Sequence, residues 1–110
     1  MVTKFSESIQ DQSIGQEVVD ADSPVKEPPL YNVVMLNDDY TTMEFVILVL
    51  TDVFRLSATV AEEKMLQIHH KGKAIVGVFP KDVAESKIYI VHSLAKQAEF
   101  PLKCVLEPSK

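Results

Sequence analysis

At Leu30 the sequence changes from a polar stretch to regularly spaced apolar residues, and this boundary most limits what the chain can fold into. Residues 1–27 are polar and show no sustained apolar period, so they cannot bury enough surface to offset the entropy of ordering them. From Leu30 onward, apolar residues recur at strand or helix spacing. We therefore predict a flexible acidic extension over residues 1–27 and one folded domain over residues 28–110.

Three short segments have the composition of β-strands. The segments LYNVVML at residues 30–36 and KAIVGVF at residues 73–79 are rich in β-branched residues, and Pro80 ends the second. The segment LKCVLE at residues 102–107 alternates, which places Leu102, Cys104 and Leu106 on one face of a final strand.

Three further segments carry apolar residues at helical spacing, and each follows a capping box. The first helix is expected to continue to about Arg55, and the second to stop at Gly72, a typical residue after a helix end. The order β-α-α-β-α-β predicts an α+β fold, a small two-layer sandwich with three helices packed against a three-stranded antiparallel sheet. The predicted capping pairs are Thr41 with Glu44, Thr59 with Glu62, and Asp82 with Glu85.

Charge and cysteine content exclude several classes of protein. Six acidic and two basic residues lie in residues 1–27, which accounts for most of the net charge of −5. No basic stripe is present, so nucleic acid is a poor partner. The single Cys104 cannot form an internal disulfide, which is typical of a reducing compartment. The longest apolar run, FVILVL, is far shorter than the roughly 20 residues of a membrane span. No signal-peptide pattern opens the chain. We therefore expect a cytoplasmic protein without membrane association.

The loop after the first strand holds Asn37, Asp38 and Asp39. Adjacent carboxylates repel each other and need compensation. Amide groups at the start of the first helix could stabilise one of them and leave the other free to face a ligand. The alternative is that Asn37 and Asp38 form an Asx-turn and Asp39 is solvated, without any function.

Beyond its main apolar stripe, the first helix carries Phe45, Leu48 and Val49 on other faces. A helix this apolar in a small domain is either buried on two sides or leaves a surface for a ligand. In the second helix, His69 lies on the same stripe as Met65, so its ring is expected to face the interior or a cleft.

The candidate site residues share one chemical property. The amide oxygen of Asn37, the carboxylate of Asp39 and a neutral nitrogen of His69 all accept hydrogen bonds, whereas a primary ammonium offers three donors. Acceptors that converge beside an apolar pocket therefore favour a protonated amine with a hydrophobic side chain next to it. The free N-terminus of a peptide has this form.

Signals for catalysis are weak. The sequence has no Gly-rich phosphate loop, no nucleophile motif and no zinc spacing, and Cys104 in a strand reads as a small apolar residue, so we expect no enzyme, cofactor or metal. The segment RLSAT between the first two helices lacks the GXXG loop of a KH module. Two rivals stay open: an interaction module whose acidic loop binds Lys or Arg, and an enzyme in which Asp38, Asp39 and His69 hold a divalent metal.

Four segments in order, YNVVMLNDDYTTMEFVILVL, MLQIHHKGKAIVGVF, DVAESK and PLKCVLE, closely resemble the ClpS family over residues 28–108. The resemblance implies a non-enzymatic adaptor of bacterial N-degron proteolysis. Such an adaptor captures substrates that begin with Phe, Tyr, Trp or Leu and delivers them to the N-terminal domain of ClpA, the unfoldase of the ClpAP protease.

The resemblance also implies roles for individual residues. Met43 corresponds to the family's gate against β-branched Ile and Val, and residues 1–27 to an extension used in handing the substrate over. The implied groups are Asn37, Asp38, Asp39 and His69 around the substrate α-amine, with Asn37, Asp39 and His69 as direct contacts; Met35, Leu36, Thr41, Met43, Val46, Met65, Ile68 and Leu102 in the side-chain pocket; and Asp82, Glu85 and Lys87 on the ClpA-binding surface.

Overall fold

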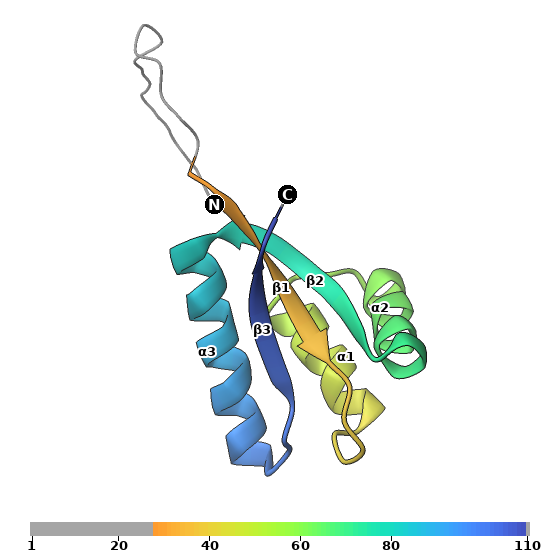
Figure 1. The fold of residues 1–110 in the computed structure, drawn as a ribbon. Coiled ribbons are helices and arrows are strands. Elements are labelled where there is room, and N and C mark those ends of the chain that lie inside the picture. Colours follow the sequence, from red (N-terminus) through yellow and green to blue (C-terminus); the bar gives the residue numbers. More distant parts are fainter. Residues whose placement is uncertain (1–27, 110) are drawn as a thin grey trace, which may run out of the picture.

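A computed structural model describes residues 28–109 of the chain (Figure 1). It confirms the predicted α+β class and the order β-α-α-β-α-β. The predicted flexible extension over residues 1–27 lies outside the described residues. The elements are β1 (Leu30–Leu36), α1 (Met43–Asp52), α2 (Ala58–Lys71), β2 (Lys73–Pro80), α3 (Lys81–Ala98) and β3 (Lys103–Pro108).

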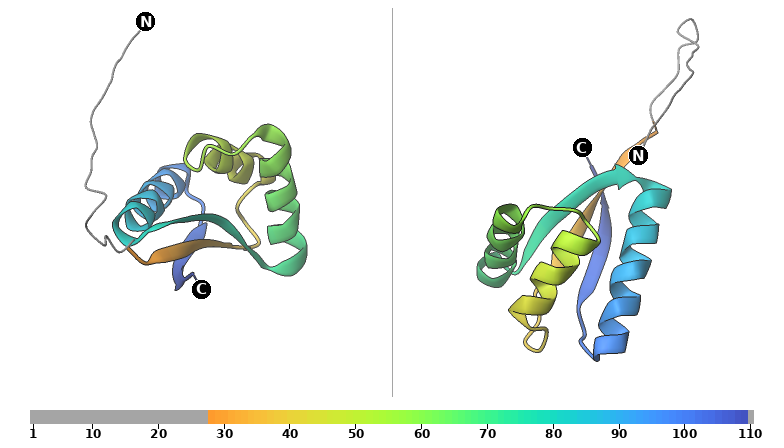
Figure 2. Two further views of the ribbon diagram at one scale, coloured as in Figure 1. Left: turned by 90° about the horizontal axis from the view of Figure 1, so that it is seen from above. Right: turned by 180° about the vertical axis from the view of Figure 1, so that it is seen from behind.

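The three strands form one antiparallel sheet in the order β2-β1-β3, with β1 in the centre. The register between β1 and β2 shifts between Val33 and Val34, so that Val33 pairs with Gly77 and Val34 with Ile75. All three helices lie on one side of the sheet (Figure 2). Within the described part of the chain, nothing covers the opposite side, which we call the open face.

The core lies between the sheet and the helices. Val33 and Met35 from β1, Leu50 from α1 and Val91 from α3 are fully buried there. As predicted, Cys104 faces this core from β3. The Lys87 ammonium of α3 also donates a hydrogen bond to the carbonyl oxygen at the end of α1, with 2.9 Å between Nζ and O. Packing and this hydrogen bond together hold α1 beside α3.

Helix α1 is covered on two sides. It lies between α2 and α3 in the view from above (Figure 2, left). Val49 is fully buried, and the ring of Phe45 packs on Phe100 with 5.0 Å between centroids. Leu48 stays 47% exposed. Most of the extra apolar surface of this helix is therefore used in packing, which leaves only its first turns for a ligand.

The predicted helix caps are wrong by one or two residues for α1 and α2. The hydroxyl of Thr42 caps α1 by accepting from the Phe45 amide at 3.2 Å, because the Thr41 hydroxyl donates instead to Asp38. Ser57 caps α2 in the same way, and Thr59 lies inside the first turn.

The predicted capping box of α3 is also wrong. This helix follows Pro80 directly, and no side chain caps it. Asp82 therefore lies in the first turn, where a negative charge is favourable beside the helix N-terminus.

Candidate functional site

The loop after β1 and the end of α2 are tied together through the backbone. The amide of Asn37 donates to the carbonyl oxygen of Gly72 at 2.9 Å, and the amide of Gly72 donates to that of Ile68 at 2.9 Å. Gly72 has φ of 91°, a left-handed conformation that ends α2 and that glycine adopts without steric cost. These bonds hold Asn37 close to the last turn of α2, where His69 lies.

Asp38 is fully engaged within the loop. One carboxylate oxygen accepts from the amides of Tyr40 and Thr41, both at 2.8 Å, and the other accepts from the Thr41 hydroxyl at 2.7 Å. Burial raises the pKa of the Asp38 carboxyl, but these three hydrogen bonds outweigh it and hold the pKa below its ordinary value. Asp38 therefore stays anionic and fixes the shape of the loop.

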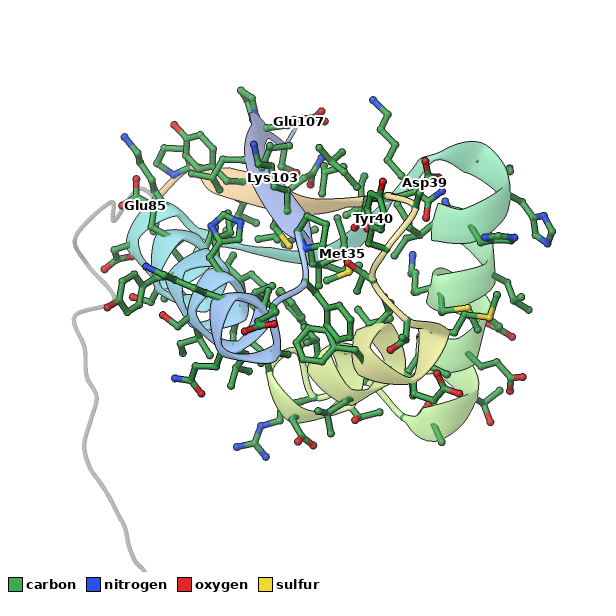
Figure 3. All side chains as sticks on the ribbon, turned by 90° about the horizontal axis from the view of Figure 1, so that it is seen from below. Met35, Asp39, Tyr40, Glu85, Lys103 and Glu107 are labelled. Atoms are coloured by element: carbon green, nitrogen blue, oxygen red, sulfur yellow. The ribbon has the colours of Figure 1, made fainter. Side chains whose placement is uncertain are left out.

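This geometry corrects one expectation and supports another. The expected compensation by the N-terminus of α1 is wrong, since Thr42 caps that helix and loop groups bind Asp38. The Asx-turn interpretation holds for Asp38. The neighbouring carboxylate of Asp39 is exposed, as is Asn37, so both are accessible to a ligand. Figure 3 shows Asp39 in the loop beside α2.

A cavity of about 220 Å³ lies between this loop, α1 and α2. Its polar side consists of the acidic loop and His69, which is exposed. Its apolar wall includes Val46, Met65 and Ile68, all less than 10% exposed, while Met43 at 47% exposure stands at the rim. The complete lining is Asn37, Asp38, Asp39, Thr41, Met43, Val46, Met65, Ile68 and His69.

The structure thus brings all four predicted amine-site residues to one cavity, together with Thr41, Met43, Val46, Met65 and Ile68 of the predicted side-chain pocket. Their roles in binding stay predictions. Every residue that lines the cavity was already a predicted site residue. What the sequence did not reveal is the backbone tie from Asn37 to Gly72, since such a bond carries no side-chain signature.

Three residues of the predicted side-chain pocket do not line the cavity. Met35 points to the helices but is fully covered by the core. Leu36 follows it and therefore points to the open face, because side chains alternate along a strand. Leu102 lines a separate cavity of about 450 Å³ at the C-terminal end of α3, since it precedes β3 on that side of the molecule.

The residues of the predicted partner surface do not all lie together. Asp82 and Glu85 are exposed at the start of α3, where they line a hollow of about 500 Å³ with Pro28, Pro29, Tyr31, Pro80 and Lys81. Figure 3 shows Glu85 on the outer side of this helix. Lys87 is not part of that hollow. Its ammonium bonds the Val53 carbonyl oxygen and lies 5.4 Å from the centroid of the Phe79 ring.

The described residues do not gather metal ligands at this site or elsewhere. No three His, Cys, Asp or Glu side chains among them are placed to hold a metal ion. Cys104 is buried, and burial raises the pKa of its thiol to about 12, so the thiol stays protonated at neutral pH. None of the helices in residues 28–109 is both long and apolar enough to cross a membrane.

Comparisons with known proteins identify one family. A family model described as ATP-dependent Clp protease adaptor protein ClpS matches residues 26–105. The ATP-dependent Clp protease adapter protein ClpS of Acetivibrio thermocellus is 51% identical over 83 residues, which are 76% of this chain and 84% of the relative. The protein of the same name from Alkalilimnicola ehrlichii is 44% identical over 96 residues, which are 87% of this chain and 91% of the relative.

A solved structure is also similar. It is the structure of Agrobacterium tumefaciens ClpS2 bound to L-phenylalaninamide, with a TM-score of 0.73 and 44% sequence identity. The match covers 76% of this chain and 100% of the other. The family model spans every residue that lines the cavity.

Proposed function

Since the chain belongs to the ClpS family of Clp protease adaptor proteins, we propose that its cavity binds the first residue of a substrate polypeptide. The family is one of adaptors and not of enzymes. In this proposal the chain selects substrates by their N-terminal residue and brings them to a Clp ATPase in the cytoplasm.

The ligand of the Agrobacterium relative indicates the chemistry. L-Phenylalaninamide has a free α-amine, a benzyl side chain and an amide that stands in for the first peptide bond. The cavity offers a counterpart for the first two groups. Asn37, Asp39 and His69 supply acceptors for an ammonium, and the wall of Val46, Met65 and Ile68 suits an apolar side chain.

One observation carries the proposal: acceptors and apolar wall meet at the same small cavity. Burying a large apolar side chain contributes about 1.5–3 kcal/mol. Each hydrogen bond to a charged group contributes about 1.5–3 kcal/mol before the costs of association are subtracted. Neither half alone is expected to bind well, so a ligand needs both a free amine and a large side chain.

The size of the cavity limits the ligand. Its volume of about 220 Å³ is smaller than the roughly 300–1,000 Å³ of pockets that enclose drug-sized molecules. It therefore suits one side chain, and we propose Phe, Tyr, Trp and Leu. Met43 at the rim acts as a gate in this proposal, because β-branched Ile and Val are stiff at χ1 and carry bulk next to the backbone.

For delivery we propose that the N-terminal domain of the ClpA unfoldase of ClpAP binds the start of α3. Asp82 and Glu85 are exposed there and form the core of this surface. Lys87 was predicted to join them, and its internal hydrogen bond would have to break for direct contact. Residues 1–27 take part in handing the substrate over in this proposal.

A peptide panel tests the proposed function. Fluorescence anisotropy is measured with a labelled peptide that begins with Phe, with the same peptide acetylated at its amine, and with one that carries Phe only internally. We expect only the first to bind. Equal competition by the internal Phe peptide, or by a Lys-rich peptide, would favour the rival interaction module.

A separate titration addresses the metal-dependent enzyme. Calorimetry with Mg²⁺, Mn²⁺ and Zn²⁺ should show no site that requires Asp38, Asp39 and His69, because Asp38 is bound within its loop. Heat that disappears in Asp39→Ala would support the rival instead.

A further inference from the structure

The open face of the sheet carries an ordered pattern of side chains. Because side chains alternate along a strand, Val34 and its cross-strand partners Ile75 and Val105 all point to this face. Val34 in the centre is 2% exposed, while Ile75 and Val105 are 41% and 37% exposed. The face therefore has an apolar row across all three strands, on the side that no described helix covers (Figure 2).

The next row toward the end of β1 is positively charged. Leu36 pairs with Lys73 on β2 and with Lys103 on β3, and both lysines are exposed. Adjacent strands lie about 4.8 Å apart, so two ammonium groups flank one leucine. Glu107 is on the same face, but near the other end of β3 (Figure 3). An acidic segment laid along β1 would find its charge partners at the Leu36 end.

This face is also hollowed. A depression of about 230 Å³ is lined by Val34, Lys73, Ile75 and Glu107, together with Gln67 and Ala74 at its side. Val34 and Ile75 form the apolar floor of this depression, and its charged rim consists of Lys73 and Glu107, while Lys103 lies outside it. Its chemistry suits an extended peptide that has both apolar and acidic side chains.

We propose that residues 18–27 of the chain's own N-terminal extension dock on the open face. This segment, VVDADSPVKE, contains four small apolar residues, and apolar and acidic residues alternate from Val19 to Asp22. It is connected to β1 through Pro28 and Pro29, a dipeptide that is typical of turns and loops. Since the segment is tethered a few residues from the face, its effective concentration there is on the order of millimolar, and weak contacts suffice.

Counting along the chain gives the register. A segment that reverses at Pro28 and Pro29 runs back over β1, with both chains advancing about 3.3 Å per residue. Val25 then comes level with the exposed Val78, which pairs with Asn32, the third residue of β1. Asp20 and Asp22 fall on either side of the level of Leu36, where the two lysines lie. Acidic residues farther from Pro28 pass beyond the face.

Paramagnetic NMR on the full-length chain tests this docking. A nitroxide is attached at Ser23→Cys, and at Ser6→Cys as a control. Cys104 need not be replaced, because it is buried and its thiol stays protonated. We expect the Ser23 label to remove most of the methyl signal of Val34, Ile75 and Val105, and to broaden the exposed outer sides of the helices far less.

Charge variants give the matched comparison. Asp20→Asn with Asp22→Asn should restore the lost methyl signals, and so should Lys73→Gln with Lys103→Gln. Glu7→Gln with Asp11→Asn changes the net charge of the chain by the same amount and should have no effect. Salt should weaken the broadening, because Lys73 and Lys103 are exposed and their attraction is screened.

Three results would overturn the docking. One is a Ser23 label that leaves the open face unaffected. Another is equal broadening over the open face and the exposed sides of the helices. The third is broadening transferred between molecules, seen when spin-labelled chain is mixed with isotope-labelled chain, since that would place a second copy on this face. None of these results bears on the peptide panel, so this inference and the proposed function fail separately.

Discussion

Replacing Asp38 by Ala should destabilise the fold, whereas replacing its neighbour Asp39 by Ala should not. The Asp38 carboxylate accepts from the amide of Tyr40 and from the amide and hydroxyl of Thr41. Water can replace it at the exposed Tyr40 amide, but the two Thr41 donors are partly buried. A hydrogen bond to a charged group contributes about 1.5–3 kcal/mol, and partial exposure reduces this, so we expect Asp38→Ala to lose about 2–3 kcal/mol of unfolding free energy.

Asp39→Ala is the control, because it removes the same charge one residue away. The Asp39 side chain is exposed, and surface substitutions outside such contacts change stability by no more than about 0.5 kcal/mol. Urea unfolding followed by far-UV circular dichroism measures both variants. Asp38→Asn, which keeps an acceptor for the amides, should lie between wild type and Asp38→Ala.

The two variants should both lose affinity for the peptide, although they differ in stability. Asp39→Ala removes an acceptor that lines the cavity, and Asp38→Ala releases the loop that holds Asn37 and Asp39 in place. Anisotropy with a peptide that begins with Phe should show a large loss of affinity for both. Equal urea midpoints for Asp38→Ala and Asp39→Ala, or unchanged affinity in either, would refute the reasoning.

Four more predictions concern Asp38, Met43, Lys87 and Cys104 in turn. The lowered pKa of Asp38 stabilises the fold at any pH above the unfolded value of about 3.9, and this stabilisation is lost as pH falls through the folded value, so the stability gap between wild type and Asp38→Asn should close below about pH 4 in acid titrations of unfolding. Met43→Ala should admit peptides that begin with Ile or Val, with little change for Phe, and a panel varied only at its first residue reads this out. Lys87→Met keeps the stem but loses the bond to the Val53 carbonyl, which should cost about 1–2 kcal/mol in urea unfolding; an unchanged midpoint would show that the bond contributes nothing. Cys104 should react with a thiol reagent only as fast as the chain unfolds, since its thiol is buried with a pKa of about 12; rapid reaction in native buffer would contradict this.

The strands were predictable because their signal is local. The run LYNVVML coincides with β1, and β2 and β3 differ from prediction by one residue at their ends. The helix caps were not predictable, because two neighbouring threonine hydroxyls could each serve as the cap of the first helix. Thr41 matched the capping pattern better than Thr42, yet Asp38 takes the Thr41 hydroxyl, a choice that depends on the loop in three dimensions.

The cavity was predictable in its polar part and in most of its wall. The convergence of Asn37, Asp39 and His69 follows from the position of their segments at one end of the sheet. Met35 and Leu102 were predicted for the side-chain pocket but do not line the cavity, for different reasons. A buried strand residue and a pocket residue have the same composition in sequence, and only packing shows which of them the core covers.

The bond from the Asn37 amide to the Gly72 carbonyl oxygen has a consequence for how the adaptor matures. It joins parts of the chain that β1–β2 pairing must first align, since Leu36 and Lys73 are the last pair of that ladder. A slip of one position would turn the side chains of β1 to the wrong face and carry the acidic loop away from His69. If the cavity binds substrates as proposed, a nascent or partly denatured molecule therefore has no receptor to offer, and only copies that have completed folding would capture cargo.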